Sequence, residues 1–174
     1  IDTRAFFGCK SLKKIILPQG IKEISKSLFE NCFSLEQVFV PDSVVEIDDR
    51  AFFDCCKLSE IKTSSNLKLI GWKAFKGCES LDNFYFPDGL ETIGDNAFLC
   101  CRSLEKIVLP KSLEYLGRGA FTGCDNAEKI EISENIKSIP AHTFSGCNKV
   151  KTIRLPEKTE KIEWRAFAFN NSLE

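Results

Sequence analysis

The sequence lacks several features that mark common functional classes. It has one His, no Met, and no Cys-x-x-Cys spacing among its 9 cysteines. Zinc sites are usually built from closely spaced Cys and His, and no nucleophile–base motif, paired-carboxylate motif or phosphate-binding Gly loop accompanies His142. We therefore predict no enzyme, and no catalytic, cofactor-binding or metal-binding residues. We interpret His142 as an exposed surface residue, because its equivalents are polar or Gly.

Charge of one sign and long apolar runs are also missing. The 24 basic and 25 acidic residues nearly cancel and are interspersed, so the basic stripe typical of nucleic-acid binding is absent. No apolar run approaches 18 residues, which excludes a membrane span in this segment, and no signal peptide or lipidation motif is visible. Hydrophobic residues still make up 43% of the chain, enough for a continuous core.

A strict repeat is the main positive feature of the sequence. Such a period is typical of a stacked solenoid, in which each repeat buries its apolar side against its neighbours. The chain begins within one repeat at Ile1 and ends within another at Glu174, without polar capping repeats. We expect a single repeat domain over residues 1–174, with about seven and a half repeats, cut at both ends from a longer protein. The repeat is carried by phenylalanines that recur every 23 residues: Phe6, Phe29, Phe52, Phe75, Phe98, Phe121, Phe144 and Phe167.

Each repeat contains an apolar pair with period two, which predicts a short strand. In one clear copy the pair is Ile107 and Leu109, so Lys106 to Leu109 is the expected strand, and Pro110 follows where the chain turns. Stacked copies are expected to pair in parallel. The equivalent pairs are Ile15/Leu17, Val38/Val40, Ile61/Thr63, Phe84/Phe86, Ile130/Ile132 and Ile153/Leu155.

The rest of the repeat predicts a second extended stretch and a tight turn. An apolar pair three residues apart, such as Leu90 and Ile93, indicates another short extended segment. The Ala-Phe segment that follows indicates a helical turn, with Phe filling the interior. Each buried Phe is expected to contribute roughly 1.5–3 kcal/mol.

One copy of the unit reads Ile93, Gly94, Asp95, Asn96, Ala97 and Phe98, then Cys101, Leu104, Ile107, Leu109 and Pro110. With this motif the unit resembles the BspA-like, or Treponema pallidum-type, leucine-rich repeat of 23 residues. The resemblance implies an α/β repeat fold, a leucine-rich-repeat solenoid with short parallel strands and short helical turns in a curved right-handed coil. It also implies a cell-surface or secreted protein, because BspA-like proteins are associated with adhesion to matrix proteins and to other cells. The match covers the whole chain.

Seven cysteines also follow the 23-residue period, each three residues after a core Phe. A residue that takes the same place in every coil is best interpreted as a ladder of small buried thiols, since parallel side-chain vectors are poorly posed for bridging. Disulfides between neighbouring coils are the alternative. Cys56 and Cys100 lie off this ladder in columns of polar residues or Gly, which predicts exposure. Neutral surface drift and a redox or intermolecular role both remain open for them.

The outward residues of the predicted strands are the candidate binding site, on the face that the family resemblance makes concave. Unlike the core columns, these columns do not repeat one residue type, and Phe39 and Tyr85 are their aromatic members. Exposed aromatics on a rigid surface are suited to anchor a partner, although aromatic residues also favour strands for their own sake. The candidate protein-binding residues are Ile16, Phe39, Lys62, Tyr85, Val108, Glu131 and Arg154 in one column and Asn83, Lys106 and Lys129 in the other.

A second candidate surface lies on the side of the expected helical turns. Phe7, Phe53 and Leu99 follow the core Phe there, and Trp72 and Trp164 share a column. We interpret these residues as half-buried edge packing in preference to a binding site.

Two functions of different classes follow from these patterns. The first is a protein-binding module on a microbial surface that engages a host or microbial surface or matrix protein. The second is a structural stalk that carries another domain and has no ligand of its own. The varied outward columns favour the first, and the lack of any sharp cluster of polar side chains keeps the second open.

Overall fold

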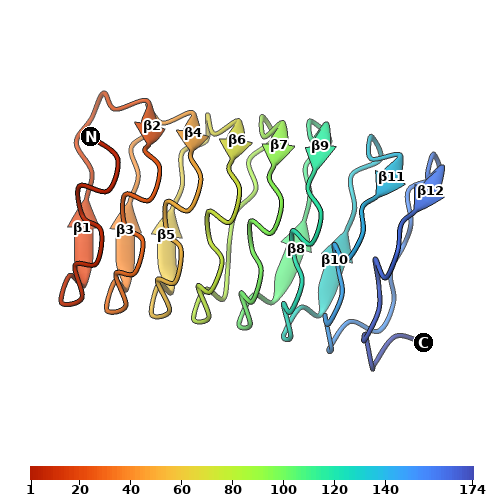
Figure 1. Cartoon of the computed structure of the whole chain (residues 1–174). Helices are drawn as coiled ribbons and strands as arrows, with labels where there is room; N and C mark the ends of the chain where they lie inside the picture. Colours follow the sequence, from red (N-terminus) through yellow and green to blue (C-terminus); the bar gives the residue numbers. More distant parts are fainter.

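The chain winds into a row of similar coils that stack side by side. The computed structural model describes all residues 1–174 and contains short parallel strands and turns, with no helix. The N-terminus lies in the first coil and the C-terminus in the last (Figure 1). The structure therefore has no helix of the length and apolarity needed to cross a membrane.

One row of strands forms the face predicted from the period-two pairs. The register is the one that the repeat dictates, with Ile15 opposite Val38 and Val38 opposite Ile61. The expected parallel pairing is thus confirmed for most coils. The row consists of β1 (Lys14–Ile16), β3 (Gln37–Phe39) and β5 (Glu60–Lys62) in one sheet, and β8 (Lys106–Val108) and β10 (Lys129–Glu131) in another.

A second row of two-residue strands confirms the second extended stretch of each repeat. Both rows are visible in Figure 1. The inward residue, such as Ile47 or Ile93, is buried in every strand of this row except β12, where Ile162 in the last coil is 49% exposed. The members are β2 (Glu23–Ile24), β4 (Glu46–Ile47), β6 (Leu69–Ile70), β7 (Thr92–Ile93) and β9 (Tyr115–Leu116) in one sheet, and β11 (Ser138–Ile139) and β12 (Lys161–Ile162) in another.

The predicted helical turns at the Ala-Phe segments are wrong. The Phe52 N–H donates to the carbonyl of Ala74 on the next coil at 2.8 Å, whereas the Phe53 N–H donates back to Arg50 at 3.0 Å. Every second N–H group of this segment thus donates to the neighbouring coil, so the continuous i to i−4 hydrogen bonds of an α-helix do not form. Each coil also places two residues at positive φ, for example Arg50 and Asp54, which a right-handed helix does not allow.

The expected strand at Phe84 and Phe86 does not form, and the one at Ile153 and Leu155 is reduced to a single bridge between Glu131 and Arg154. Both Phe side chains are inward and nearly buried. The Phe84 ring meets Phe75 and Phe98 edge-on at centroid distances of 5.1 and 4.9 Å. Two phenyl rings occupy more room than the inward pairs of the other coils, and we attribute the lost pairing to this bulk.

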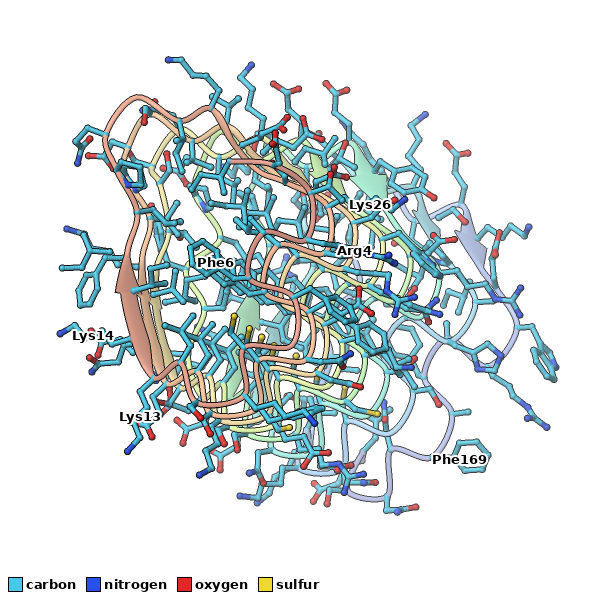
Figure 2. All side chains as sticks on the ribbon, turned by 60° about the vertical axis from the view of Figure 1, so that its left-hand side comes forward. Arg4, Phe6, Lys13, Lys14, Lys26 and Phe169 are labelled. Atoms are coloured by element: carbon cyan, nitrogen blue, oxygen red, sulfur yellow. The ribbon has the colours of Figure 1, made fainter.

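The recurrent phenylalanines form one continuous stack through the core. The ring of Phe75 lies 5.1 Å from those of both Phe52 and Phe98, with interplanar angles of 11° and 10°. The six inner rings are fully buried, whereas Phe6 and Phe167 at the two ends are only partly buried. Figure 2 shows Phe6 pointing into the first coil, while Lys14 of β1 and the preceding Lys13 point outward. The stack is part of a single core cluster of 44 buried residues.

The periodic cysteines form a second buried ladder, and all nine cysteines are free. The Cys78 thiol donates to the carbonyl oxygen of Phe52, one coil back, at 3.2 Å, and Cys101 does the same to Phe75 at 3.2 Å. The thiols therefore satisfy carbonyl groups of the core as well as filling space. Cys56 and Cys100 are half-buried rather than exposed as predicted.

The column of Cys100 is shaped by the backbone. Cys100 has φ 62° and its equivalent Gly77 has φ 77°, in the left-handed region that Gly, Asn and Asp adopt most easily. The Gly residues in this column, which suggested an exposed surface position, are thus explained by the turn conformation.

Candidate binding surface

The structure brings the predicted binding residues together on the strand face. Nine of the ten side chains are exposed, and Phe39 is half-buried. The most exposed apolar members are Ile16 at 71% and Tyr85 at 65%, followed by Val108 at 42%. The inward residues of the neighbouring positions, such as Val38 and Ile107, are buried, so the apolar groups on the outward face are not part of the core. The role of these ten residues in binding stays a prediction.

Charge is distributed unevenly over this face. The Lys14 ammonium lies over the Phe39 ring, 5.0 Å from its centroid. Lys129 pairs with Glu131 at 2.7 Å, so these two predicted members neutralise each other. Lys62 and Lys106 make no ion pair. Lys14 and Arg154 are also without an ion pair, so unpaired cations extend along the face and only Lys129 is neutralised by a carboxylate on it.

A hollow of about 380 Å³ opens on the strand face next to β8. It lies between the coil that carries Phe84 and the coil that carries β8, where the ladder is interrupted. Four predicted residues line it: Asn83, Tyr85, Lys106 and Val108. Sequence reasoning placed these residues on the surface but did not foresee the hollow. The available signal was that only this repeat has Phe at both inward strand positions.

The turn-containing side carries aromatic rings covered by cations. Lys73 lies 4.0 Å from the Trp72 ring centroid, and Arg50 lies 4.3 Å from that of Phe53. Phe53 and Leu99 are half-buried, whereas Phe7 and Trp164 are 45% and 61% exposed. Much of the aromatic surface on this side is thus engaged within the molecule.

His142 is half-buried rather than exposed as predicted. The edge of its ring meets Trp164 at a centroid distance of 4.8 Å and an interplanar angle of 87°. Its φ of 61° puts it in the same turn column as Arg50 and Lys73. Packing against Trp164 and the turn conformation account for its position.

A second break in pairing lies between β9 and β11, next to a hollow of about 510 Å³. In the preceding coils an N–H bonds across this ladder, as from Gly117 to the Ile93 carbonyl at 2.8 Å. Pro140 stands at the next equivalent position and has no N–H to give. The hydroxyl of Ser138, which lines the hollow, is buried without a hydrogen-bond partner. The sequence signal for this break was Pro140 itself.

Burial raises the pKa of the ladder thiols, to about 11 for Cys32 and about 12 for Cys147. These groups are therefore neutral and poorly reactive at physiological pH. No group of three or more His, Cys, Asp or Glu side chains is arranged to hold a metal ion.

The family model described as the BspA type leucine rich repeat region matches residues 1–98 and 70–174, in 6 copies. The chain belongs to the BspA-type leucine-rich repeat family. Members of this family are repeat proteins of the kind that generally serve as scaffolds for protein interaction. The predicted resemblance is thereby confirmed, and so is the solenoid of parallel strands.

Solved structures of bacterial repeat proteins share this fold. A leucine-rich repeat protein from Treponema pallidum is 31% identical, with a TM-score of 0.89 over 94% of this chain and 79% of its own. One from Bacteroides ovatus is 29% identical, with a TM-score of 0.90 over 93% of this chain. A protein from Faecalibacterium prausnitzii, described as a leucine rich cell surface protein, is 28% identical over 98% of this chain, with a TM-score of 0.58.

This chain spans 44% of the length of the Bacteroides ovatus protein and 55% of the Faecalibacterium prausnitzii protein. A comparison with curated proteins finds no match.

Proposed function

We propose that this chain is a protein-interaction module of a microbial cell-surface protein, and that it binds a host or microbial protein through its strand face. One observation carries the proposal. Core columns repeat the same residue type from coil to coil, whereas the outward strand columns change and leave Ile16, Tyr85 and Val108 exposed. Apolar groups that do not serve the fold are available to a partner.

Rigidity of the surface also supports this function. The strand face rests on the continuous Phe stack, with centroid distances of 5.1–5.7 Å between successive rings. A preformed face loses little conformational entropy on binding. The cell-surface location rests on the family and on the description of the Faecalibacterium prausnitzii relative. In keeping with a scaffold, we assign the chain no catalytic role.

A binding screen of the folded chain against host surface and matrix proteins tests the proposal. Phe39→Ser with Tyr85→Ser should weaken any interaction found, by at least about tenfold for a central anchor. Trp164→Ser is the matched control, because Trp164 is an exposed aromatic on the turn side. Binding that depends on Trp164 and ignores the strand-face variants would contradict the proposal. A folded chain that binds nothing in the screen would favour the structural stalk.

A further inference from the structure

The second row of strands is open at one junction, between β9 and β11. At every other junction of this row backbone N–H groups donate to the preceding coil, as from Glu160 and Lys161 to the Lys137 carbonyl at 2.7 and 3.2 Å. The equivalent donors at the open junction are Lys137 and Ser138, and neither bonds to the Glu114 carbonyl. Figure 1 shows β11 set apart from the row that ends with β9.

The open junction leaves several polar groups without a hydrogen-bond partner in the protein. They are the N–H groups of Lys137 and Ser138, the carbonyls of Glu114 and Leu116, and the Ser138 hydroxyl. All four residues line the hollow of about 510 Å³ at this junction. Ser138 Oγ is also the one buried side-chain oxygen of the chain that has no partner. Folded proteins pair nearly all such groups, so the hollow holds donors and acceptors that a ligand can use.

The opening is short, because the two coils remain joined on both sides of it. On one side the Asn135 side-chain amide donates to the Lys111 carbonyl at 2.6 Å. On the other side the Gly119 N–H donates to the Ala141 carbonyl at 3.0 Å. An inserted peptide strand would need about 4.8 Å of additional separation between the coils, and these two bonds oppose that movement. The hollow therefore suits a compact ligand.

The charged side chains around the hollow nearly balance. Its lining contains three carboxylates and two cations. Two of them pair with a residue outside the lining, Lys137 with Glu160 at 3.1 Å and Glu163 with Lys161 at 3.0 Å. No group of three or more carboxylate, His or Cys side chains is arranged to hold a metal ion. An uncharged ligand is therefore favoured over an ion. The charged lining residues are Asp95, Glu114, Glu163, Arg118 and Lys137.

Tyr115 gives the hollow a flat apolar wall. Its side chain is 51% exposed, and its hydroxyl donates to Asp95 at 3.1 Å, which restrains the ring. The other two apolar residues of the lining, Leu116 and Ile136, are each only 4% exposed. One aromatic ring beside many polar groups matches a ligand that has an apolar face and several hydroxyls.

We propose that the hollow between β9 and β11 binds a neutral saccharide. One C–H face of a sugar ring packs on Tyr115, and its hydroxyls bond to Ser138 Oγ, the Lys137 N–H and the Glu114 carbonyl. Each sugar hydroxyl both donates and accepts, as the mixed set of groups in the hollow requires. The same chemistry is offered by a free sugar and by a glycan attached to a protein. This site lies apart from the strand face and adds a second ligand to the proposed function.

Titration of the whole chain with small sugars tests the inference. The probes are neutral mono- and disaccharides of glucose, galactose, mannose and N-acetylglucosamine, with glucuronic acid and glucosamine as charged counterparts. Saturation-transfer NMR should detect a neutral sugar with a Kd roughly in the millimolar range, and the charged sugars should bind more weakly. An array of protein-linked neutral glycans separates the two sources. Binding to the array as well as to the free sugar assigns an attached glycan, and binding of the free sugar alone assigns a free ligand.

Substitutions in the hollow should weaken the sugar. Tyr115→Ser should lower its affinity by at least about tenfold, and Ser138→Ala by roughly threefold or more. Pro140→Gly supplies the N–H that the Leu116 carbonyl lacks, and Gly117 is the equivalent residue of the preceding coil. Slow hydrogen exchange of the new amide at position 140 would show that the ladder has closed. Closure that leaves sugar affinity unchanged would contradict the inference, and the other two variants decide the outcome if the ladder stays open.

Tyr85→Ser is the matched control, because Tyr85 is the other tyrosine of the chain and is 65% exposed on the strand face. It should leave sugar binding unchanged, and both tyrosine variants should keep the wild-type circular dichroism spectrum. Failure of every neutral sugar to bind, preference for a charged sugar, or equal losses in Tyr85→Ser and Tyr115→Ser would overturn the inference. So would binding of an extended peptide at Tyr115 in place of any sugar.

The result is separable from that of the proposed function. A protein partner of the strand face should be weakened by Tyr85→Ser and not by Tyr115→Ser. Loss of sugar binding alone therefore leaves the strand-face proposal intact, and a protein partner can be absent while the sugar still binds.

Discussion

The rings of Phe75 and Phe98 stack with their centroids 5.1 Å apart and their planes 10° from parallel, although 23 residues separate them in the chain. Both also contact the edge of the Phe84 ring. The same pair of residues therefore holds adjacent coils at a constant spacing and fixes the ring that interrupts the strand ladder. Core packing and the shape of the candidate site are connected through this contact.

Truncation of a central ring should cost much more than truncation of a terminal one. Phe75→Ala removes contacts to Phe52, Phe84 and Phe98 and should lower the free energy of unfolding by about 3–5 kcal/mol. Phe6→Ala loses one stacked neighbour, Phe29, at a half-buried site, and should cost roughly half as much. Urea unfolding followed by circular dichroism measures both. Equal losses of unfolding free energy in the two variants would mean that the central Phe rings do not stabilise the core more than the terminal ones.

Alkylation should distinguish the thiols by burial. In the folded protein Cys9, Cys56 and Cys100, which are half-buried, should react, and the six fully buried ladder cysteines should be protected. After unfolding without reductant all nine should be labelled, because none is bridged. Mass spectrometry of the labelled protein counts them. Bridged ladder pairs in the unreduced sample would refute the free-thiol ladder.

Alkaline pH should destabilise the fold. Burial raises the pKa of Cys32 from 9.0 to about 11, so this thiol keeps its proton in the folded state at a pH where the unfolded chain has lost it. The contribution of this thiol to the free energy of unfolding is fully present below about pH 9 and is lost as the pH rises toward 11. Urea unfolding at about pH 8 and about pH 10 measures the decline.

Cys32→Ala with Cys147→Ala is the control for the pH effect. The double variant should be less stable at both pH values, because two buried side chains become smaller. Between the two pH values, its free energy of unfolding should nevertheless fall by less than that of the wild type, because two titrating groups are removed. An unchanged difference would assign the effect to other groups.

The pair of Glu30 and Arg50 should matter far more than the exposed ion pairs. The Glu30 side chain is 5% exposed and receives hydrogen bonds from Arg50, one of them from Nε at 3.1 Å. Arg50→Gln leaves a buried carboxylate without its cation and should cost roughly 2–4 kcal/mol, less than for a fully buried pair because Arg50 is partly exposed. Lys68→Gln, which breaks the exposed pair with Glu91, should cost roughly 0–1 kcal/mol. Thermal unfolding compares the two variants, and similar losses of stability would contradict the larger role given to the Glu30–Arg50 pair.

Amide hydrogen exchange should reveal the interrupted ladder. The amides of residues 84–86 have no backbone acceptor and should exchange faster than the equivalent amides of residues 38–40 and those of Ile107 and Leu109, which bond to neighbouring coils. Phe84→Ile with Phe86→Leu restores the residue types of the paired coils and should slow exchange in this segment. Rapid exchange that persists in the double variant would show that ring bulk is not the cause of the break.

Much of the fold could be read from the repeat, because a constant period requires the same environment in every coil. Phe52, Cys55 and Ile47 recur at fixed offsets, and each proved fully buried. The helical turn could not be excluded in this way. Its Ala-Phe segment has ordinary helix-compatible residues, and only the hydrogen bonds to the next coil, as from Phe52 to Ala74, divert the backbone from a helix.

The candidate site was predictable in its location but not in its shape. Outward strand positions alternate with inward ones, so Tyr85 and Val108 were placed on the surface correctly. The hollow beside them depends on how the Phe84 and Phe86 rings pack against Phe98 and Phe121. Likewise, Cys100 and His142 were predicted to be exposed, because the equivalent positions of other repeats hold several residue types, as surface positions do. The structure shows that these positions share a positive φ, which is what limits the residues found there.

The sequence by itself determined the solenoid, its register and the composition of its core, since each of these follows from a period without insertions. Only the tertiary structure decided where the ladders are interrupted. Phe86 fails to bond to Val108, and Pro140 cannot bond to the carbonyl of Leu116, because of side-chain volume in one case and a missing N–H in the other. These local departures from the repeat arise from contacts between coils, which a single repeat does not contain.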